Sequence, residues 1–177
     1  MATVKEDTIL LGSGDLYLGQ VDPNATETEI QAALVNVGAI SGGATITYQT
    51  KFTDVKSANR GTIMSFLTDE EVTFKSGVLT WNLENLSRLY PAKFTSDTTK
   101  KRVGIGGIKN VPINYLRFVH TKPNGKKLTV NIFKAQAQDG FDITFDSEKE
   151  TVLDVTFKAL SVTNKTDGNL VEIIEEI

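Results

Sequence analysis

Alternating apolar and polar residues dominate the chain, and this two-residue period predicts a protein built mainly from β-strands. Ala44, Ile46 and Tyr48 alternate with polar residues, which places apolar side chains on one face of a strand and polar ones on the other. The same pattern predicts about eight short strands along the chain. They cover residues 15–19, 44–49, 71–81, 113–120, 128–133, 141–146, 153–158 and 170–174.

Turn residues predict that two pairs of these strands form hairpins. Asn124 and Gly125 lie between the fourth and fifth predicted strands and supply the positive φ angles that a tight turn requires. Residues 146–150 form a short, charged connection between the sixth and seventh strands, so we predict a second hairpin there.

Helical periodicity is limited to two segments. We predict a two-turn helix over residues 83–90, because Asn82 can cap its start and Pro91 ends it. Thr26 and Glu29 have the spacing of a capping box, which predicts a second short helix after Thr26 that Gly38 ends. The face that would pack the first helix onto the sheet consists of Leu83, Leu86 and Leu89.

Two polar segments interrupt the alternation. Residues 50–62 end in the turn-like sequence Asn59-Arg60-Gly61, and residues 92–112 are similarly open. A compact domain rarely keeps loops this long unless they bind something, so we interpret both segments as long loops with a binding role. The alternative is a mobile surface excursion in each case.

Length and composition indicate one globular domain over residues 1–177. The chain is 40% hydrophobic and 23% charged, which argues against both disorder and a membrane protein. We expect no membrane insertion, because no apolar run exceeds four residues. The amino terminus lacks the apolar region of a secretory signal. The expected fold class is mainly β, a β-sandwich or barrel with one flanking α-helix.

Charge is nearly balanced overall but uneven along the chain. The net charge of −3 argues against a general nucleic-acid binder, which carries a basic surplus. Residues 93–127 hold nine basic residues and one acid, a net +8, whereas residues 139–177 hold ten acids and three lysines, a net −7. These segments are either two solvated faces within one fold or complementary surfaces on identical subunits.

Candidate catalytic chemistry is sparse. The chain has no Cys, which excludes disulfides, thiolate zinc sites and cysteine nucleophiles. His120 is the only histidine, so a two-histidine metal site cannot form, and we expect it at an exposed strand position. The glycine clusters at residues 12–14 and 104–107 lack the Lys-Ser/Thr ending of a phosphate loop.

Three aspartates were weighed as calcium ligands. Asp139, Asp142 and Asp146 could bind calcium in principle, but they lack EF-hand spacing and fit a solvated face better. No pair of acids stands out for general acid and base chemistry. We therefore expect no catalytic, cofactor or metal site, and a protein that is not an enzyme.

The order of the segments resembles the major tail tube proteins of long-tailed bacteriophages. The match spans roughly residues 8–174 and consists of an order of strands, loop and helix rather than one diagnostic motif. Similar folds occur in the tubes of contractile tails and of type VI secretion. The segments that carry the resemblance are residues 37–48, 59–61, 71–77, 81–86, 155–160 and 167–171.

This resemblance implies a β-sandwich with a flanking helix whose copies form hexameric rings that share an inner β-barrel. Rings would stack into a hollow tube through which DNA passes into the host without specific binding. Terminal arms, about residues 1–8 and 172–177, would bridge subunits, and the loop at residues 50–62 would reach a neighbouring ring. The loop contacts would be Lys51, Phe52, Asp54, Lys56, Asn59 and Arg60.

The resemblance also implies partners and a location. The homo-hexamer would meet tape-measure and tail-terminator or tip proteins, and the chain would be made in the host bacterial cytoplasm and function in the virion tail. A lumen that carries DNA should avoid tight phosphate binding, so we expect an acidic or neutral inner wall with lysines facing outward or paired. Residues 44–51, 70–77 and 113–133 are the candidate wall strands, and possible lumen or ring contacts are Thr47, Gln49, Glu71, Thr73 and Lys75.

A different class of function stays open from the residues alone. A monomeric ligand-binding β-sandwich, such as a carbohydrate-binding module, would need exposed aromatic platforms. The single Trp81 lies next to the predicted helix start, where we expect burial. An enzyme that uses His120 ranks third.

Overall fold

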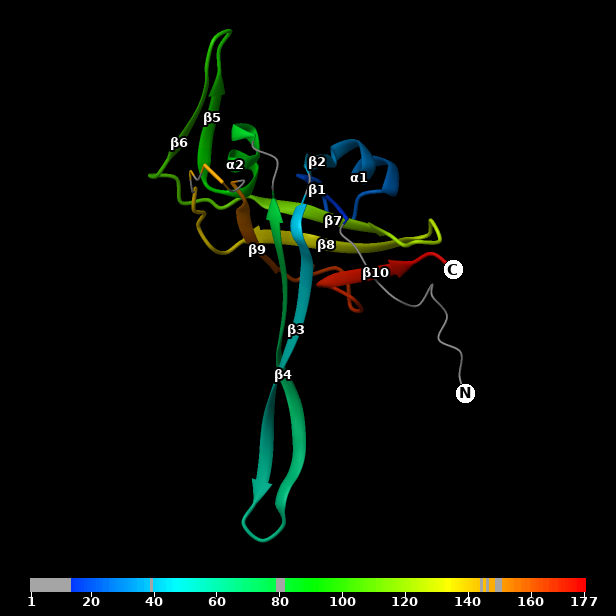
Figure 1. Ribbon diagram of the computed structural model, residues 1–177. Helices are drawn as coiled ribbons and strands as arrows, with labels where there is room; N and C mark the ends of the chain where they lie inside the picture. Colours follow the sequence, from blue (N-terminus) through cyan, green and yellow to red (C-terminus); the bar gives the residue numbers. More distant parts are fainter. Residues whose placement is uncertain (1–13, 39, 79–81, 144, 146, 149–150) are drawn as a thin grey trace.

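The computed structural model describes residues 14–38, 40–78, 82–143, 145, 147–148 and 151–177. Two short helices and ten strands occur in this part of the chain, with a body at the centre and two hairpins that project from it (Figure 1). The elements are β1 (Asp15–Gly19), α1 (Glu27–Ala33), β2 (Val35–Gly38), β3 (Ile40–Ser57), β4 (Gly61–Val78), α2 (Leu83–Leu89), β5 (Ala92–Ser96), β6 (Lys101–Ile105), β7 (Ile113–Thr121), β8 (Lys127–Ala137), β9 (Leu153–Ala159) and β10 (Val171–Glu175).

An eight-stranded antiparallel sheet forms the body. Its order is β2-β1-β7-β8-β9-β4-β3, and β10 pairs with β8 beside this path. One edge of β8 therefore serves two partners, because Ala135–Ala137 pair with β9 whereas Leu128–Ile132 pair with β10. The sheet branches at this point. A separate two-stranded sheet contains β5 and β6.

The centre of the sheet is buried on both faces. Adjacent residues of a strand point to opposite faces, and in β7 both Tyr115 and Leu116 are buried. Leu116 belongs to the main core, which also includes Leu86 and Leu89 of α2. Tyr115 belongs to a smaller cluster on the other face, where it packs with Ile30 of α1. The two helices thus cover opposite faces.

Both predicted helices are present, and so is the predicted turn at Asn124–Gly125. The helix α1 ends at Ala33 rather than at Gly38, because Val35–Gly38 pair with β1 as strand β2. The Asn82 side chain caps α2 by accepting a hydrogen bond from the Glu84 amide, and α1 has the complete capping box of Thr26 and Glu29. Leu83, which lies on the predicted face of α2, is partly buried against the core. The β7–β8 hairpin turns with Gly125 at a φ of 82°.

The expected strand at residues 141–146 and its hairpin are wrong. Residues 141–143 and 145 lie outside the strands, and β9 pairs with β4 and β8 instead. Phe141 and Ile143 anchor the segment by packing against the main core, and the Phe141 ring lies 5.0 Å from that of Tyr90. β9 finds six partners along β4, so the alternation around Phe141 reports anchoring of a loop rather than strand pairing.

Most of the two segments interpreted as open loops forms hairpins, and residues 106–112 of the second lie outside them. β3 and β4 stay paired from Thr50↔Glu70 to Ser57↔Gly61, so only residues 58–60 connect them. Residues 92–96 and 101–105 likewise pair as β5 and β6. Alternation reports a strand only when one face is buried, and hairpins that are exposed on both faces do not produce it.

Two further expectations change in the structure. Residues 172–175 of the expected inter-subunit arm pair with β8 of the same chain. His120 is buried rather than exposed. It lines a cavity with Phe74 and Phe118, where β3 and β4 pass over the end of β7 and cover it. The amino-terminal arm at residues 1–8 and the position of Trp81 lie outside the described residues.

Candidate assembly surfaces

The outer part of the β3–β4 hairpin projects far from the body (Figure 1). We call residues 50–69 the distal arm. All of its residues are exposed except Ser57, which is half-buried. β4 pairs with β9 only from Thr73 to Val78, and β3 pairs only with β4 in the described part of the chain. Both edges of the distal arm therefore lack a partner strand within the described residues.

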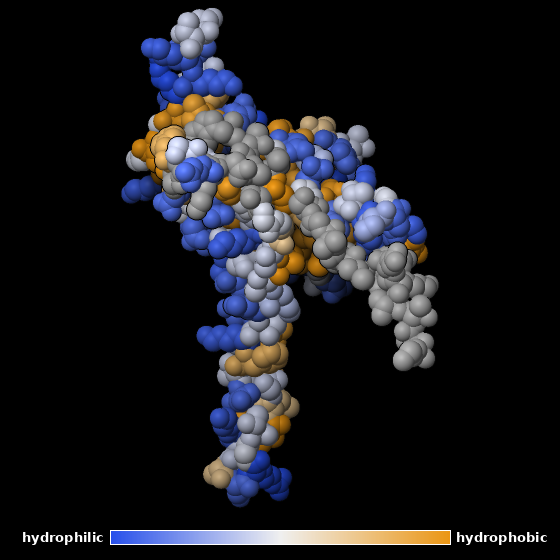
Figure 2. Space-filling model, viewed as in Figure 1, coloured by the Kyte–Doolittle hydropathy of each residue, from blue (hydrophilic) through white to orange (hydrophobic). Residues whose placement is uncertain are grey.

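Apolar side chains lie on both faces of the distal arm. Successive cross-strand pairs alternate between faces, so Phe52 and Leu67 share one face whereas Val55, Met64 and Phe66 share the other. Each of these side chains is between 46% and 57% exposed. Figure 2 shows the resulting apolar patches between polar residues along the arm.

The distal arm has two properties that bear on contacts with other molecules. An isolated two-stranded hairpin is marginally stable in water. A long edge strand with exposed apolar side chains is also a template for pairing with another chain. The distal arm combines both properties over twenty residues.

Side-chain hydrogen bonds hold the two strands of the arm in register. The Ser65 hydroxyl donates to the Asp54 carboxylate at 2.7 Å, and the Thr68 hydroxyl donates to the Lys51 carbonyl at 3.1 Å. At the base of the arm the Tyr48 hydroxyl donates to Glu70, and this bond raises the pKa of Tyr48. These bonds within the chain therefore support the paired conformation of the arm.

The structure brings the predicted loop contacts together on this arm. Four of them lie on β3 and two in the turn, and all are exposed: Lys51, Phe52, Asp54, Lys56, Asn59 and Arg60. The opposite strand of the arm was not predicted from the sequence; there Ile63, Met64, Phe66 and Leu67 are exposed. Their apolar run after the Asn59-Arg60-Gly61 turn was the available signal for a hairpin.

The five possible lumen or ring contacts share one face at the base of the hairpin. This face points away from the core, because Val72 and Phe74 are buried at the intervening positions. Its one cross-strand ion pair joins Glu71 to Lys158 of β9 at 2.5 Å, and that bond raises the pKa of Lys158. The five residues are Thr47, Gln49, Glu71, Thr73 and Lys75.

The basic and acidic segments meet within one chain. Lys122, next to the β7–β8 turn, forms an ion pair with Glu175 of β10, and the Lys127 amide donates to the Glu176 carboxylate at 2.8 Å. Of the two interpretations of the charge pattern, the contact inside one fold is therefore correct for these residues. Other charges remain available for contacts between copies, notably the exposed Lys100 and Lys101 of the β5–β6 hairpin.

A buried arginine ties α1 to the sheet. The Arg117 side chain is 9% exposed and donates to both oxygens of the Glu27 carboxylate, at 2.6 and 2.9 Å. Its Nε donates to the Asn131 side chain at 2.8 Å. The hydrogen bond from Arg117 lowers the pKa of Glu27. This network fixes α1 on the face opposite α2.

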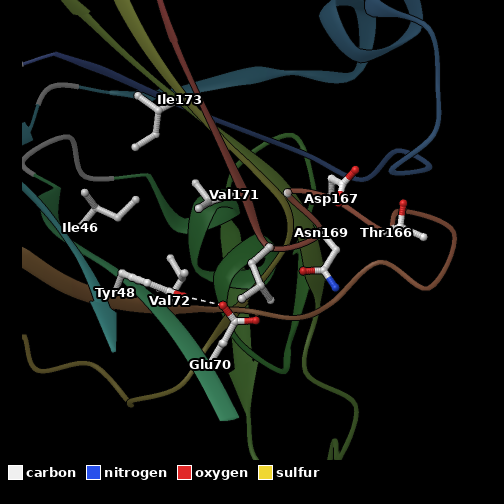
Figure 3. A pocket seen from close by; sticks show the side chains of 11 residues that line it. Ile46, Tyr48, Glu70, Val72, Thr166, Asp167, Asn169, Val171 and Ile173 are labelled. Atoms are coloured by element: carbon white, nitrogen blue, oxygen red, sulfur yellow. Dashed lines mark hydrogen bonds between the residues drawn. The ribbon is translucent and has the colours of Figure 1, made fainter. Parts of the chain in front are cut away.

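An open groove of about 610 Å³ lies between the base of the β3–β4 hairpin and β10. We call it the root groove; Figure 3 shows its side chains converging from the two walls. One wall carries Ile46, Tyr48 and Val72, and the other carries Leu170, Val171 and Ile173. Glu70 and Asp167 add acidic groups to its lining. A second cavity of about 290 Å³ shares Ile46 with it.

Metal and membrane features were also considered. No group of three or more potential metal ligands occurs in the described residues. Asp139 and Asp142 line a small cavity with Asp154 and Lys75, and Asp146 lies outside the described residues. Neither of the two helices in the described part of the chain, each of seven residues, is long and apolar enough to cross a membrane.

The fold of this chain is similar to that of a solved structure, whereas its sequence matches no described family. No protein-family model and no curated protein matches the sequence. A solved structure described as the tail of an empty GTA particle, computed with helical refinement and C6 symmetry, is similar to this chain with a TM-score of 0.44 and 9% identity. The match covers 83% of this chain and 92% of that one.

Proposed function

We propose that this chain is the structural subunit of a phage-type tail tube, in which six copies form a ring and rings stack into a hollow conduit. The observation that carries this proposal is the distal arm, which has two unpaired edges and apolar side chains on both faces. The resemblance of the sequence to major tail tube proteins supports the ring of six and the tube.

Pairing between the arms of neighbouring copies would give each unpaired strand edge a partner. β3 of one copy beside β4 of the next is a head-to-tail contact, and repetition around an axis closes a barrel that has no exposed edge. One ring-closing contact uses both unpaired edges of every arm. Stacking of rings then requires a second, different contact.

The polar face at the base of the hairpin suits a lumen for DNA. Thr47, Gln49 and Thr73 are uncharged, and Glu71 is paired with Lys158. Such a wall neutralises few phosphates, so it releases few counterions and binds DNA weakly. In this proposal DNA passes without specific binding. Lys75 is the remaining basic group of the five, and it lines a cavity with Asp139, Asp142 and Asp154 of the same chain.

The remaining parts of the proposal follow from this role. The chain acts in the virion tail after synthesis in the host bacterial cytoplasm, meets tape-measure and tail-terminator or tip proteins, and needs neither a cofactor nor catalysis. The same architecture would serve the tube of a contractile tail or of type VI secretion.

Electron microscopy of the purified full-length chain tests the proposal directly. Negative staining should show six-fold rings or tubes at concentrations where sedimentation detects no monomer. Deletion of residues 53–66, which removes most of the distal arm, should abolish rings and tubes, and Thr28→Ala in α1, which leaves the arm intact, is the control. A strictly monomeric chain would contradict the proposal.

The root groove favours one competing function. Its volume of about 610 Å³ and its apolar walls fall in the range of small-molecule sites, and Tyr48 offers an aromatic surface. A monomeric ligand-binding module would use this groove for a small ligand such as a glycan. Binding of a glycan array by a monomeric chain, abolished by Tyr48→Ala, would support that function instead.

A further inference from the structure

We propose that the root groove of one copy receives the distal arm of a second copy, with Val55, Met64 and Phe66 as its apolar anchors. This inference rests on the proposed tube and assigns the second contact, the one that stacks rings. It makes the groove a protein-binding site whose occupant is the same chain.

Apolar side chains that are only partly buried line the groove. Its lining includes Ile46, Tyr48 and Ile173, which are 37%, 57% and 56% exposed. These side chains converge on one space from β3 and β10 (Figure 3). Contiguous exposed apolar surface of this kind marks an interaction site.

The arm of the same copy cannot fill the groove. Tyr48 lies at the base of the arm and Val55 seven residues further along β3, which at about 3.3 Å per residue corresponds to roughly 23 Å. β3 and β4 remain paired over this whole distance, so the outer end cannot fold back onto its own base. An arm that enters the groove must therefore come from another molecule.

The anchors form a matching surface. The pairs Thr53↔Phe66 and Val55↔Met64 place the three apolar side chains on one face of the arm. They lie near the turn, where the arm reaches furthest from its own body (Figure 1). Insertion would bury apolar surface on both partners at once, which is the main source of interface energy.

Charges on the two surfaces have opposite sign. The distal arm carries Lys51, Lys56 and Arg60 against Asp54 and Asp69, a net charge of +1. The lining of the groove carries two acids, Glu70 and Asp167, and no basic residue, a net charge of −2. Opposite charges around an apolar centre steer the encounter and fix its register.

The basic β5–β6 hairpin is a weaker occupant. It projects from the opposite end of the body and would also be attracted by acidic groups (Figure 1). Its exposed outer end consists of polar and charged residues from Thr95 to Arg102. An apolar groove selects the occupant that buries apolar side chains, so the distal arm is favoured.

Cysteine cross-linking of the full-length chain tests the contact. The chain has no Cys, so each introduced thiol is unique. Separately purified Met64→Cys and Ile173→Cys variants are mixed, allowed to assemble and oxidised. We expect a covalent dimer of the two variants. The control replaces Ile173→Cys by Thr98→Cys, which sits in the exposed β5–β6 turn and should not cross-link to position 64.

The outcomes separate this inference from the proposed tube. Rings or tubes without a cross-link between positions 64 and 173 would overturn the arm-in-groove contact and leave the tube standing. A chain that stays monomeric and does not cross-link would overturn both. Cross-linking of position 64 to position 98 would identify the β5–β6 hairpin as the neighbour of the arm and overturn the groove assignment.

Charge substitutions provide a second measurement. Phe66→Asp and Ile173→Asp change exposed side chains, so circular dichroism should show an unchanged fold. Loss of one interface anchor should weaken the stacking contact roughly 30-fold or more, which leaves single rings in place of tubes. Ile105→Asp on β6, also at an exposed position, is the matched control and should assemble normally. Unchanged tubes in both test variants would contradict the contact.

Discussion

The molecule contains two long antiparallel hairpins that meet very different surroundings. β7–β8 is buried on both faces at Tyr115 and Leu116, and strands flank it on both sides. The outer part of β3–β4 is exposed on both faces and has no flanking strand among the described residues. Backbone pairing is the same in both. The difference lies in burial, so one hairpin stabilises the fold and the other leaves its apolar side chains exposed.

Removing the distal arm should give the largest effect on assembly and almost none on the body. Deletion of residues 53–66, with Phe52 and Leu67 joined by Asn-Gly, keeps a two-residue hairpin turn. We expect complete loss of rings and tubes by electron microscopy and an unfolding midpoint close to that of the wild-type monomer. A large drop in the midpoint would show instead that the arm belongs to the core.

Truncation of matched phenylalanines should separate the two regions. Phe157→Ala removes a fully buried ring from the main core and should lower the free energy of unfolding by about 3–5 kcal/mol. Phe66→Ala removes a ring that is 51% exposed and should cost less than about 0.5 kcal/mol in the monomer. Urea unfolding under monomeric conditions measures both. Similar losses would contradict the division between body and arm.

Removal of the Glu27 carboxylate, which pairs with Arg117, should destabilise the body less than Phe157→Ala does. Glu27→Gln leaves a buried guanidinium with its Asn131 bond but without its counter-charge, which should cost about 1–2 kcal/mol. The low pKa of Glu27 adds a pH dependence. Its stabilising effect is fully present above the unfolded-state pKa, near 4.5, and is lost as the pH falls through the lower folded-state pKa.

Urea unfolding between pH 7 and pH 3 measures this dependence. The wild-type chain should lose more stability than Glu27→Gln over the acidic part of the range, because the variant has no carboxylate to protonate at this position. Parallel curves for the two proteins would show that the Arg117 network does not contribute to the pH dependence.

Removal of a helix cap should give the smallest effect. Thr26→Ala deletes the hydroxyl that accepts a hydrogen bond from the Glu29 amide in the capping box of α1. The free energy of unfolding should fall by about 1 kcal/mol. Thr28→Ala changes an exposed threonine inside the same helix and should be near neutral. Neither variant should alter assembly. Impaired tubes in Thr26→Ala would mean that α1 lies at an interface.

Local chemistry allowed several elements to be predicted from sequence. Asn82, the Thr26–Glu29 pair and Gly125 act within a few residues of themselves, so their caps and turn could be recognised without any partner. Burial on one face produced the alternation at Val72 and Phe74. The same alternation gave a wrong strand at Phe141 and Ile143, which anchor a loop. It also gave a wrong exposure for His120, which is buried where β3 and β4 pass over β7.

The sequence by itself determined the mainly β class, the two capped helices and the β7–β8 turn, because each depends on short-range periodicity or hydrogen bonding. Only the tertiary structure decided that residues 50–69 form a projecting hairpin, that β10 returns to β8, and that Ile46 and Ile173 face one groove. Those features depend on contacts between residues far apart in the chain. A two-residue or helical period carries no record of such contacts, since it reports only which side of an element is buried.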